Sequence, residues 1–309
     1  MMPGTRGDSR GGGLSMTFRI QQPRRASAQR RPSGEPAPKV RPKRTGPVRV
    51  ELISVGRELL RGKIADGNAQ RVARHLTQKG VLIRRITVVD DTSKAIATAL
   101  REALERDPHL VVTTGGLGPA EDDHTLEGVC EALELPMTLS HPAQVMVEEA
   151  YRRLRAKKIV SDGGLTHTRE KLCKIPVGST PVPNPLGVSP GVFVPLPGGA
   201  IVLCLPGMPE EMQSVLEAAL PMMNVGLEGE VARREVEAPT SDESQLGPLI
   251  DRLTHEFPGL WINSRPAGSR KTGGRIVIRV EATGETQDDA DAAVDGCVKR
   301  LLALAAGSP

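Results

Sequence analysis

Aromatic side chains are scarce in this sequence of 309 residues, which contains one Trp, one Tyr and three Phe. Proteins that hold single-stranded nucleic acid without sequence preference stack successive bases on aromatic rings. Five rings make such a platform hard to assemble. We therefore do not expect nucleic acid to be the main partner of this protein.

Long apolar runs are also missing. No stretch approaches the roughly 20 apolar residues that cross a bilayer, and the N-terminus lacks the apolar segment of a secretion signal. The four cysteines lie far apart without a C-x-x-C pair, which argues against a zinc site or a disulfide framework: Cys130, Cys173, Cys204 and Cys297. We expect buried free thiols in a soluble, cytoplasmic protein that has no membrane partner.

Positive charge is concentrated at the N-terminus. Residues 1–44 hold eleven Arg and Lys against Asp8 and Glu35, a local charge of +9, so the rest of this +4 chain carries −5. The stretch is rich in Pro, Gly, Ser and Arg and cannot bury enough apolar surface to offset its ordering entropy. We predict a disordered basic tail over residues 1–46, which could still attract nucleic acid by charge alone.

From residue 48, short β-branched runs alternate with amphipathic segments. The pattern predicts strands at 48–55, 81–89, 110–114 and 201–205, and helices at 66–80, 93–106 with Ser93 as N-cap, 123–133, 142–157 and 210–220. The segment between about 158 and 200 is expected to be mainly loops. Such alternation indicates βαβ units, which build a mostly parallel sheet with helices on both faces and ligands at the carboxyl ends of the strands.

The pattern changes near residue 229 to a compact unit of its own. It predicts strands at 231–237, 260–263 and 275–282, with helices at 241–256 and 286–302. We therefore predict a main domain over 47–228 and a small α/β domain over 229–309. Because the small domain lacks a clear Gly-x-x-Gly clamp for nucleic acid, Gly268–Lys271 is interpreted as a mobile hairpin tip.

The strongest chemical signal is the loop 115–125, between a buried strand and a helix. Gly115, Gly116 and Gly118 allow sharp backbone turns that point amides at an anion, and a helix beginning near Asp123 adds its positive dipole end. Asp122 and Asp123 would repel phosphate unless a divalent cation lies between them. A metal or catalytic role for this pair competes with simple helix capping.

Other nucleotide-binding signatures are absent from this loop. No Gly-Lys-Ser/Thr follows it, and its glycines do not have the dinucleotide-binding spacing. Kinase and dehydrogenase functions are therefore not favoured.

Two further turns have a composition suited to the same pocket. The segment 183–191 combines Pro with Gly, and the segment 205–212 ends a strand and opens a helix. Glu58 follows the first strand, and Asn68 lies near the start of the next helix. Alone, each turn also fits a purely structural role, and Asn68 also fits a helix cap.

Four segments in this order carry a family resemblance: SVGRELLRGKIADGNAQ at 54–70, TGGLGPAEDDHT at 114–125, NPLGVSPG at 184–191 and LPGMPEEM at 205–212. Together they resemble the competence/damage-inducible protein A (CinA-like) family, whose N-terminal domain belongs to the MoaB/Mog molybdopterin-binding group. The resemblance implies a three-layer α/β domain with a mostly parallel sheet, followed by a small KH-like α/β domain. It also implies that the deamidase domain of longer family members is missing here.

The resemblance further implies a metal-dependent pyrophosphatase acting on ADP-ribose and related dinucleotides, with Mg²⁺, Mn²⁺ or Co²⁺. Asp122 and Asp123 would be catalytic and, together with Glu58, would hold the metal. The phosphorylated small-molecule ligand would contact Gly115, Gly116, Leu117, Gly118, Thr125, Asn68, Asn184, Gly187, Pro206 and Gly207. We also expect a homo-oligomer.

Two positions depart from the family pattern. Arg57 stands where the family has Asp, and Ala120 where it has Thr. A cation at position 57 could displace a metal or bind phosphate directly. Three hypotheses therefore stay open: a pyrophosphatase, a non-catalytic molybdopterin-binding protein, and nucleic-acid attachment through the basic tail.

Overall fold

The computed structural model describes residues 48–223, 229–240, 242–267, 275–284 and 286–305. The predicted basic tail at 1–46 and the predicted hairpin tip at Gly268–Lys271 lie outside the described residues.

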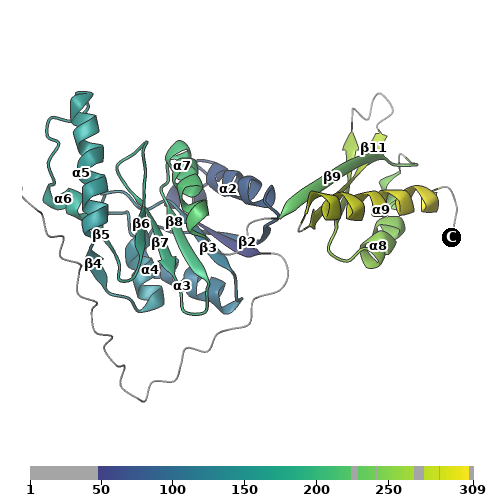
Figure 1. Cartoon of the computed structure of the whole chain (residues 1–309), viewed down its shortest axis with the longest axis horizontal. Helices are drawn as coiled ribbons and strands as arrows, with labels where there is room; N and C mark the ends of the chain where they lie inside the picture. Colours follow the sequence, from purple (N-terminus) through teal and green to yellow (C-terminus); the bar gives the residue numbers. More distant parts are fainter. Residues whose placement is uncertain (1–47, 224–228, 241, 268–274, 285, 306–309) are drawn as a thin grey trace, which may run out of the picture. The chain divides into compact units, whose positions relative to one another are not determined.

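A six-stranded sheet with the order β2-β1-β3-β8-β7-β6 forms the centre of the first part of the chain (Figure 1). Four of its strands are parallel: β1 (Arg49–Val55), β2 (Leu82–Val89), β3 (Leu110–Thr114) and β8 (Ile201–Leu205). The other two, β7 (Gly191–Pro195) and β6 (Thr180–Val182), run antiparallel at one edge. The prediction of a mostly parallel sheet is confirmed.

The antiparallel edge lies in the segment that the sequence predicted to be mainly loops. Both strands are only three to five residues long and contain Pro or Gly. Such short runs have no readable period, and they become strands because β8 offers a pairing edge to β7, which in turn pairs with β6.

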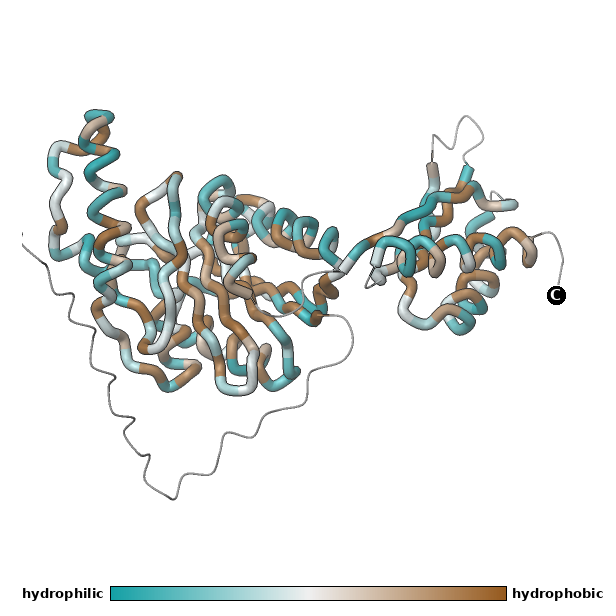
Figure 2. Tube along the Cα trace, in the orientation of Figure 1, coloured by the Kyte–Doolittle hydropathy of each residue, from teal (hydrophilic) through white to brown (hydrophobic). Residues whose placement is uncertain are grey.

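Helices cover both faces of this sheet. One core joins it to α2 (Gly67–Thr77) and α7 (Pro209–Ala219), and the other joins it to α3 (Ser93–Glu105) and α4 (Thr125–Leu133). All five residues of β3 are buried, as expected for a parallel strand covered on both sides. Figure 2 shows the central strands in the brown of hydrophobic residues, with teal on the outward helix faces.

Two helix starts differ from the sequence-based prediction. The N-cap of α3 is Thr92, whose Oγ1 accepts a hydrogen bond from the amide of Ala95 at 3.3 Å, and Ser93 is the first helical residue. Helix α4 begins at Thr125 instead of Asp123, because the carboxylate of Asp123 bonds within the preceding loop. Asp123 is therefore a loop residue.

A smaller layer lies beside the sheet. It contains the two-stranded antiparallel pair β4 (Met137–Leu139) and β5 (Lys174–Pro176), the long helix α5 (His141–Ala156), α6 (His167–Glu170) and the 3-10 turn η1 (Lys171–Cys173). The Arg169 guanidinium lies 3.8 Å from the centre of the Tyr151 ring, a cation–π contact that ties α6 to α5.

Residues 230–305 form a second sheet with the order β10-β11-β9. Its strands are β9 (Glu230–Glu237), β10 (Trp261–Ala267) and β11 (Arg275–Gly284), and α8 (Gly247–Glu256) and α9 (Gln287–Ala305) share an apolar core with them. Helix α8 begins later than predicted, because the 3-10 turn η3 (Glu243–Gln245) precedes it.

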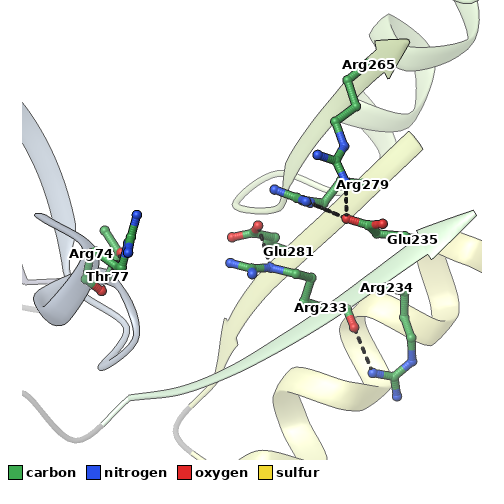
Figure 3. Close-up of polar contacts among 8 residues, drawn as sticks. All are labelled: Arg74, Thr77, Arg233, Arg234, Glu235, Arg265, Arg279 and Glu281. Atoms are coloured by element: carbon green, nitrogen blue, oxygen red, sulfur yellow. Dashed lines mark hydrogen bonds and ion pairs between the residues drawn. The ribbon is translucent and has the colours of Figure 1, made fainter. Parts of the chain in front are cut away.

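The arginines on this second sheet are paired with carboxylates (Figure 3). Glu235 accepts from the Nη2 of Arg265 at 3.0 Å and from the Nε of Arg279 at 2.9 Å, and Arg233 bonds to Glu281 at 2.7 Å. Arg279 and Glu235, like Glu281 and Arg233, are cross-strand neighbours in the register of β11 and β9. Their pairing leaves little positive charge free for phosphates.

No helix in the described part of the chain is both long and apolar enough to cross a membrane. All four cysteines are free and buried, as predicted. Burial raises the pKa of the Cys204 thiol to about 12 and those of Cys130 and Cys173 to about 11, so none of these three is a nucleophile at neutral pH.

Glu51 is a charged residue inside the main sheet, and Arg106 at the end of α3 neutralises it. The guanidinium donates to both carboxylate oxygens, at 2.7 and 2.6 Å, and the Glu51 side chain is only 4% exposed. Replacing Arg106 with Met leaves a buried carboxylate without its partner. We expect the free energy of unfolding, measured by urea denaturation, to fall by about 2 to 3 kcal/mol.

Arg101→Met is the matched control, because Arg101 lies on the same helix and pairs with Glu131 with both side chains more than 40% exposed. Its loss should stay below about 1 kcal/mol. Equal losses in the two variants would contradict the assignment of Glu51 as a buried charge.

Candidate functional site

A cavity of about 620 Å³ lies at the carboxyl ends of β1, β3 and β8. This volume is typical of small-molecule sites, and the position is the one expected for a ligand of a parallel sheet. Most of the predicted site residues line it: Glu58, Asn68, Gly115, Gly116, Leu117, Gly118, Asp122, Asp123, Pro206 and Gly207. The structure therefore brings together four segments that are far apart in the sequence.

The floor of the cavity depends on a backbone reversal at Gly115 and Gly116. Both residues have left-handed φ angles, +95° and +65°. A Cβ on Gly115 would lie 2.4 Å from the carbonyl oxygen of Val55, and a Cβ on Gly116 would lie 2.3 Å from Oγ1 of Thr125. Any side chain at either position would thus strain the turn and clash with its neighbours.

The glycine loop offers unpaired amides. The Gly115 amide donates to the carbonyl of Leu205 at 3.0 Å, so it serves the sheet rather than a ligand. The amides of Gly116, Leu117 and Gly118 have no hydrogen-bond partner among the described residues. Three successive free donors at a pocket wall form a site suited to phosphate oxygens.

Thr125 does not line the cavity. It is fully buried, and its hydroxyl donates to the carbonyl of Gly115 at 2.7 Å while its amide donates to the carbonyl of Gly116 at 3.0 Å. The structure therefore places Thr125 behind the loop, where both bonds stabilise the reversal.

The acidic residues of the loop are not equivalent. Asp123 accepts a hydrogen bond from the amide of Ala120 at 3.0 Å and braces the loop. Asp122 is exposed at the cavity and makes no hydrogen bond or ion pair with another described residue, although its charge attracts that of Arg57. No three Asp, Glu, His or Cys side chains of the described residues are grouped closely enough to hold a metal by themselves. Glu58 lines the same cavity without completing such a group.

The cavity as a whole is strongly acidic. Its carboxylates are Glu58, Asp66, Asp91, Asp122, Asp123 and Glu211, and Arg71 is the only basic side chain that lines it in the described structure. A phosphorylated ligand would need added positive charge to enter such a pocket.

Arg57, which departs from the family pattern, lies outside the cavity lining. Its Nε and Nη2 donate to Asp90 at 3.1 and 2.8 Å, and Nη2 also donates to Asp91 at 2.9 Å. The guanidinium lowers the pKa of Asp90, whereas burial and the neighbouring Asp90 raise that of Asp91. Arg57 thus offsets part of the charge of two carboxylates, of which Asp91 lines the cavity.

Asn184 is the centre of the 184–191 loop and does not line the cavity. Its Nδ2 donates to the carbonyl of Ser189 and to Oε2 of Glu211, both at 2.8 Å. Its Oδ1 accepts from the amides of Leu186 at 3.2 Å and Gly187 at 2.9 Å. All four bonding positions of the side chain are used. The structure therefore places Asn184 and Gly187 behind the cavity, which this loop lines through Val188 and Ser189.

Asn68 joins two walls. Its Nδ2 donates to the carbonyl of Gly207 at 2.7 Å, which fixes the first turn of α2 against the Pro206–Gly207 turn. Its Oδ1 is buried without a partner among the described residues, as is Oδ2 of Asp66, the N-cap of α2.

Four charged lining residues were not identified from the sequence: Asp66, Arg71, Asp91 and Glu211. Asp66 and Glu211 lie inside the quoted motifs, so their position in a motif was a usable signal. Arg71 lies one helical turn after Asn68, where the i, i+3 rule places the two on one face. Asp91 follows β2, and only the strand order shows that β2 lies next to β1.

Residues 51–224 match the family described as a probable molybdopterin binding domain. The chain belongs to this family. Among curated relatives, Protein PH0439 of Pyrococcus horikoshii is 38% identical over 232 residues, which are 75% of this chain and 89% of that protein. A protein of Caldivirga maquilingensis is 34% identical over 263 residues, which are 84% of this chain and 97% of its own.

Among solved structures, the CinA protein of Thermoplasma acidophilum is 36% identical and has a TM-score of 0.51. The likeness covers 57% of this chain and 98% of that one. The predicted relation to CinA-like proteins with a MoaB/Mog domain is therefore confirmed. That CinA is described as having unknown function, so any activity must be argued from the residues of the cavity.

The role of Asn184 can be tested with Asn184→Asp. The new carboxylate would face Glu211 and the carbonyl of Ser189 at the positions where Nδ2 now donates. We expect the free energy of unfolding at pH 7 to fall by about 2 to 3 kcal/mol.

Repulsion and burial should raise the pKa of the introduced Asp in the folded protein above its unfolded value. The stability deficit should therefore shrink as the pH is lowered from 7 to 5, because the proton binds the folded state more tightly. Asn263→Asp, at an exposed position on β10, is the control and should change stability little. A deficit independent of pH would contradict this role of Asn184.

Proposed function

We propose that the cavity binds the diphosphate of an ADP-ribose-type dinucleotide and hydrolyses it with the help of a divalent cation. The observation that carries the proposal is the combination of three unpaired amides, at Gly116, Leu117 and Gly118, with the carboxylates of Asp122 and Asp123 on one cavity wall. Amides suit phosphate oxygens and carboxylates suit a cation.

The donor set fits a cation that is shared with the ligand. Mg²⁺ is commonly held by one or two carboxylates and completes its coordination with substrate phosphates and water, so three preassembled protein ligands are not needed. Asp122, Asp123 and Glu58, which line the same cavity, would hold the ion, and the Arg57 guanidinium, bonded to Asp90 and Asp91, lies outside the cavity lining. A divalent cation would supply the positive charge that the acidic cavity lacks.

The chain's own residues would then position the reaction. The loop amides hold oxygens of one phosphate and stabilise the charge that develops there. A water molecule attacks that phosphorus, the bridging P–O bond breaks, and the second phosphate leaves with the bridging oxygen. Asp122, exposed at the cavity, accepts the proton of the attacking water. From ADP-ribose the products are AMP and ribose 5-phosphate.

Asp122→Asn tests this assignment, because it removes the charge and keeps the size of the side chain. We expect kcat for ADP-ribose hydrolysis with Mg²⁺, Mn²⁺ or Co²⁺ to fall on the order of 100-fold, measured as AMP released. Circular dichroism would verify that the variant is folded.

Glu121→Gln is the matched control, since Glu121 is the exposed neighbour of Asp122 and does not line this cavity. The turnover of this variant should stay within about twofold of that of the original protein, because Glu121 takes no part in the proposed metal binding or proton transfer. Full activity of folded Asp122→Asn, or no hydrolysis by the unaltered protein with any of the three cations, would reject the catalytic proposal.

A second candidate is a non-catalytic molybdopterin-binding protein. The family match supports it, and the cavity has apolar side chains suited to a flat pterin ring, including Leu59, Ile64, Val188 and Met208. In this case the glycine-loop amides would hold the terminal phosphate of molybdopterin.

The two candidates predict different ligands after purification. For the pterin-binding candidate, acid denaturation and oxidation of the purified protein should release a fluorescent pterin in near-stoichiometric amount, and Gly116→Ala should reduce it strongly because a Cβ there clashes with Thr125. A pterin-free protein that hydrolyses ADP-ribose would decide against this candidate.

A further inference from the structure

Arg71 on α2 is the one basic side chain that lines the cavity in the described structure. It forms no ion pair and no side-chain hydrogen bond with any other described residue. It stands among six carboxylates of the same cavity, none of which engages it.

Two other arginines near these segments are engaged. Arg57 is bonded to Asp90 and Asp91, and Arg106 holds Glu51. Arg71 differs from these two in that its guanidinium lines the acidic cavity and has no partner among the described residues. Its five donors are available to a ligand.

Neighbouring contacts hold the backbone around Arg71 in place. Asn68, three residues earlier on the same helical face, is bonded to the carbonyl of Gly207. Gly207 in turn packs on the glycine loop, since a Cβ there would lie 3.4 Å from Cα of Gly115. The start of α2 is thereby fixed relative to the amides of Gly116–Gly118, and Arg71 shares the cavity with them.

We infer that Arg71 forms a second anion subsite, which binds the distal phosphate of a ligand whose first phosphate lies on the glycine-loop amides. The inference rests on the proposed function and names its substrate class: compounds with two linked phosphates, in preference to monophosphates. A planar guanidinium binds two phosphate oxygens at once and keeps its charge at every physiological pH. With the loop amides and a divalent cation it supplies positive groups to both phosphates.

The test compares AMP with the non-hydrolysable ADP analogue α,β-methylene-ADP, which carries a second phosphorus group joined to the first through a methylene bridge. Isothermal titration calorimetry with the full chain and Mg²⁺ gives both dissociation constants for the unaltered protein, Arg71→Gln and Arg74→Gln. Arg74 is the matched control, because it is an exposed arginine one turn further along α2 that does not line the cavity. Arg71→Lys adds a variant that keeps the positive charge but cannot bind two phosphate oxygens at once as the planar guanidinium does.

We expect Arg71→Gln to weaken α,β-methylene-ADP at least about tenfold and AMP less than about twofold, while Arg74→Gln leaves both within about twofold. Arg71→Lys should fall between the unaltered protein and Arg71→Gln. If the unaltered protein binds both probes and Arg71→Gln behaves like Arg74→Gln, or weakens both probes equally, the Arg71 subsite is wrong and the proposed function stands. If the unaltered protein binds neither probe, the nucleotide assignment of the cavity fails, and the subsite fails with it.

Discussion

The reversal of the backbone at Gly115 and Gly116 is the constraint on which the rest of the site depends. At this point the chain leaves the fully buried strand β3 and turns against Val55 and Thr125. Each glycine Cα therefore has room for hydrogen atoms but not for a side chain. Thr125 holds the turn from behind with its hydroxyl and its amide. The next three residues line the cavity, and their amides have no partner among the described residues, because the sheet uses only the amide of Gly115. Phosphate binding is thus a consequence of how the strand ends.

Charge balance is the second constraint. The cavity gathers carboxylates from several segments, and repulsion among them would grow as solvent is excluded by a ligand. Arg57 offsets part of this charge at the end of β2, where it forms ion pairs with Asp90 and Asp91, the two aspartates that follow that strand. Arg57 does this without lining the cavity itself.

Several polar side chains of the quoted motifs form hydrogen bonds that hold the backbone of the site in place. Asn184 uses every donor and acceptor of its side chain to shape its own loop, and Asn68 joins α2 to the turn after β8. Motif membership alone does not separate a residue that touches a ligand from one that holds such a residue in place. The distinction comes from where the side-chain atoms find partners, which depends on segments far away in the chain.

The sequence by itself determined the strand–helix alternation, the glycine loop and the four segments that meet at the cavity, because hydrophobic period and turn chemistry are local properties. It did not reveal strands β6 and β7, which are too short to show a period and form because β7 pairs with β8 and β6 pairs with β7. Only the tertiary structure decided that Thr125 and Asn184 are buried supports, that Arg57 pairs with Asp90 and Asp91, and that Arg71 lines the cavity without a partner among the described residues. Each of these outcomes depends on which distant groups lie within hydrogen-bonding range, and side-chain partners of this kind are set by packing between segments rather than by neighbours in the sequence.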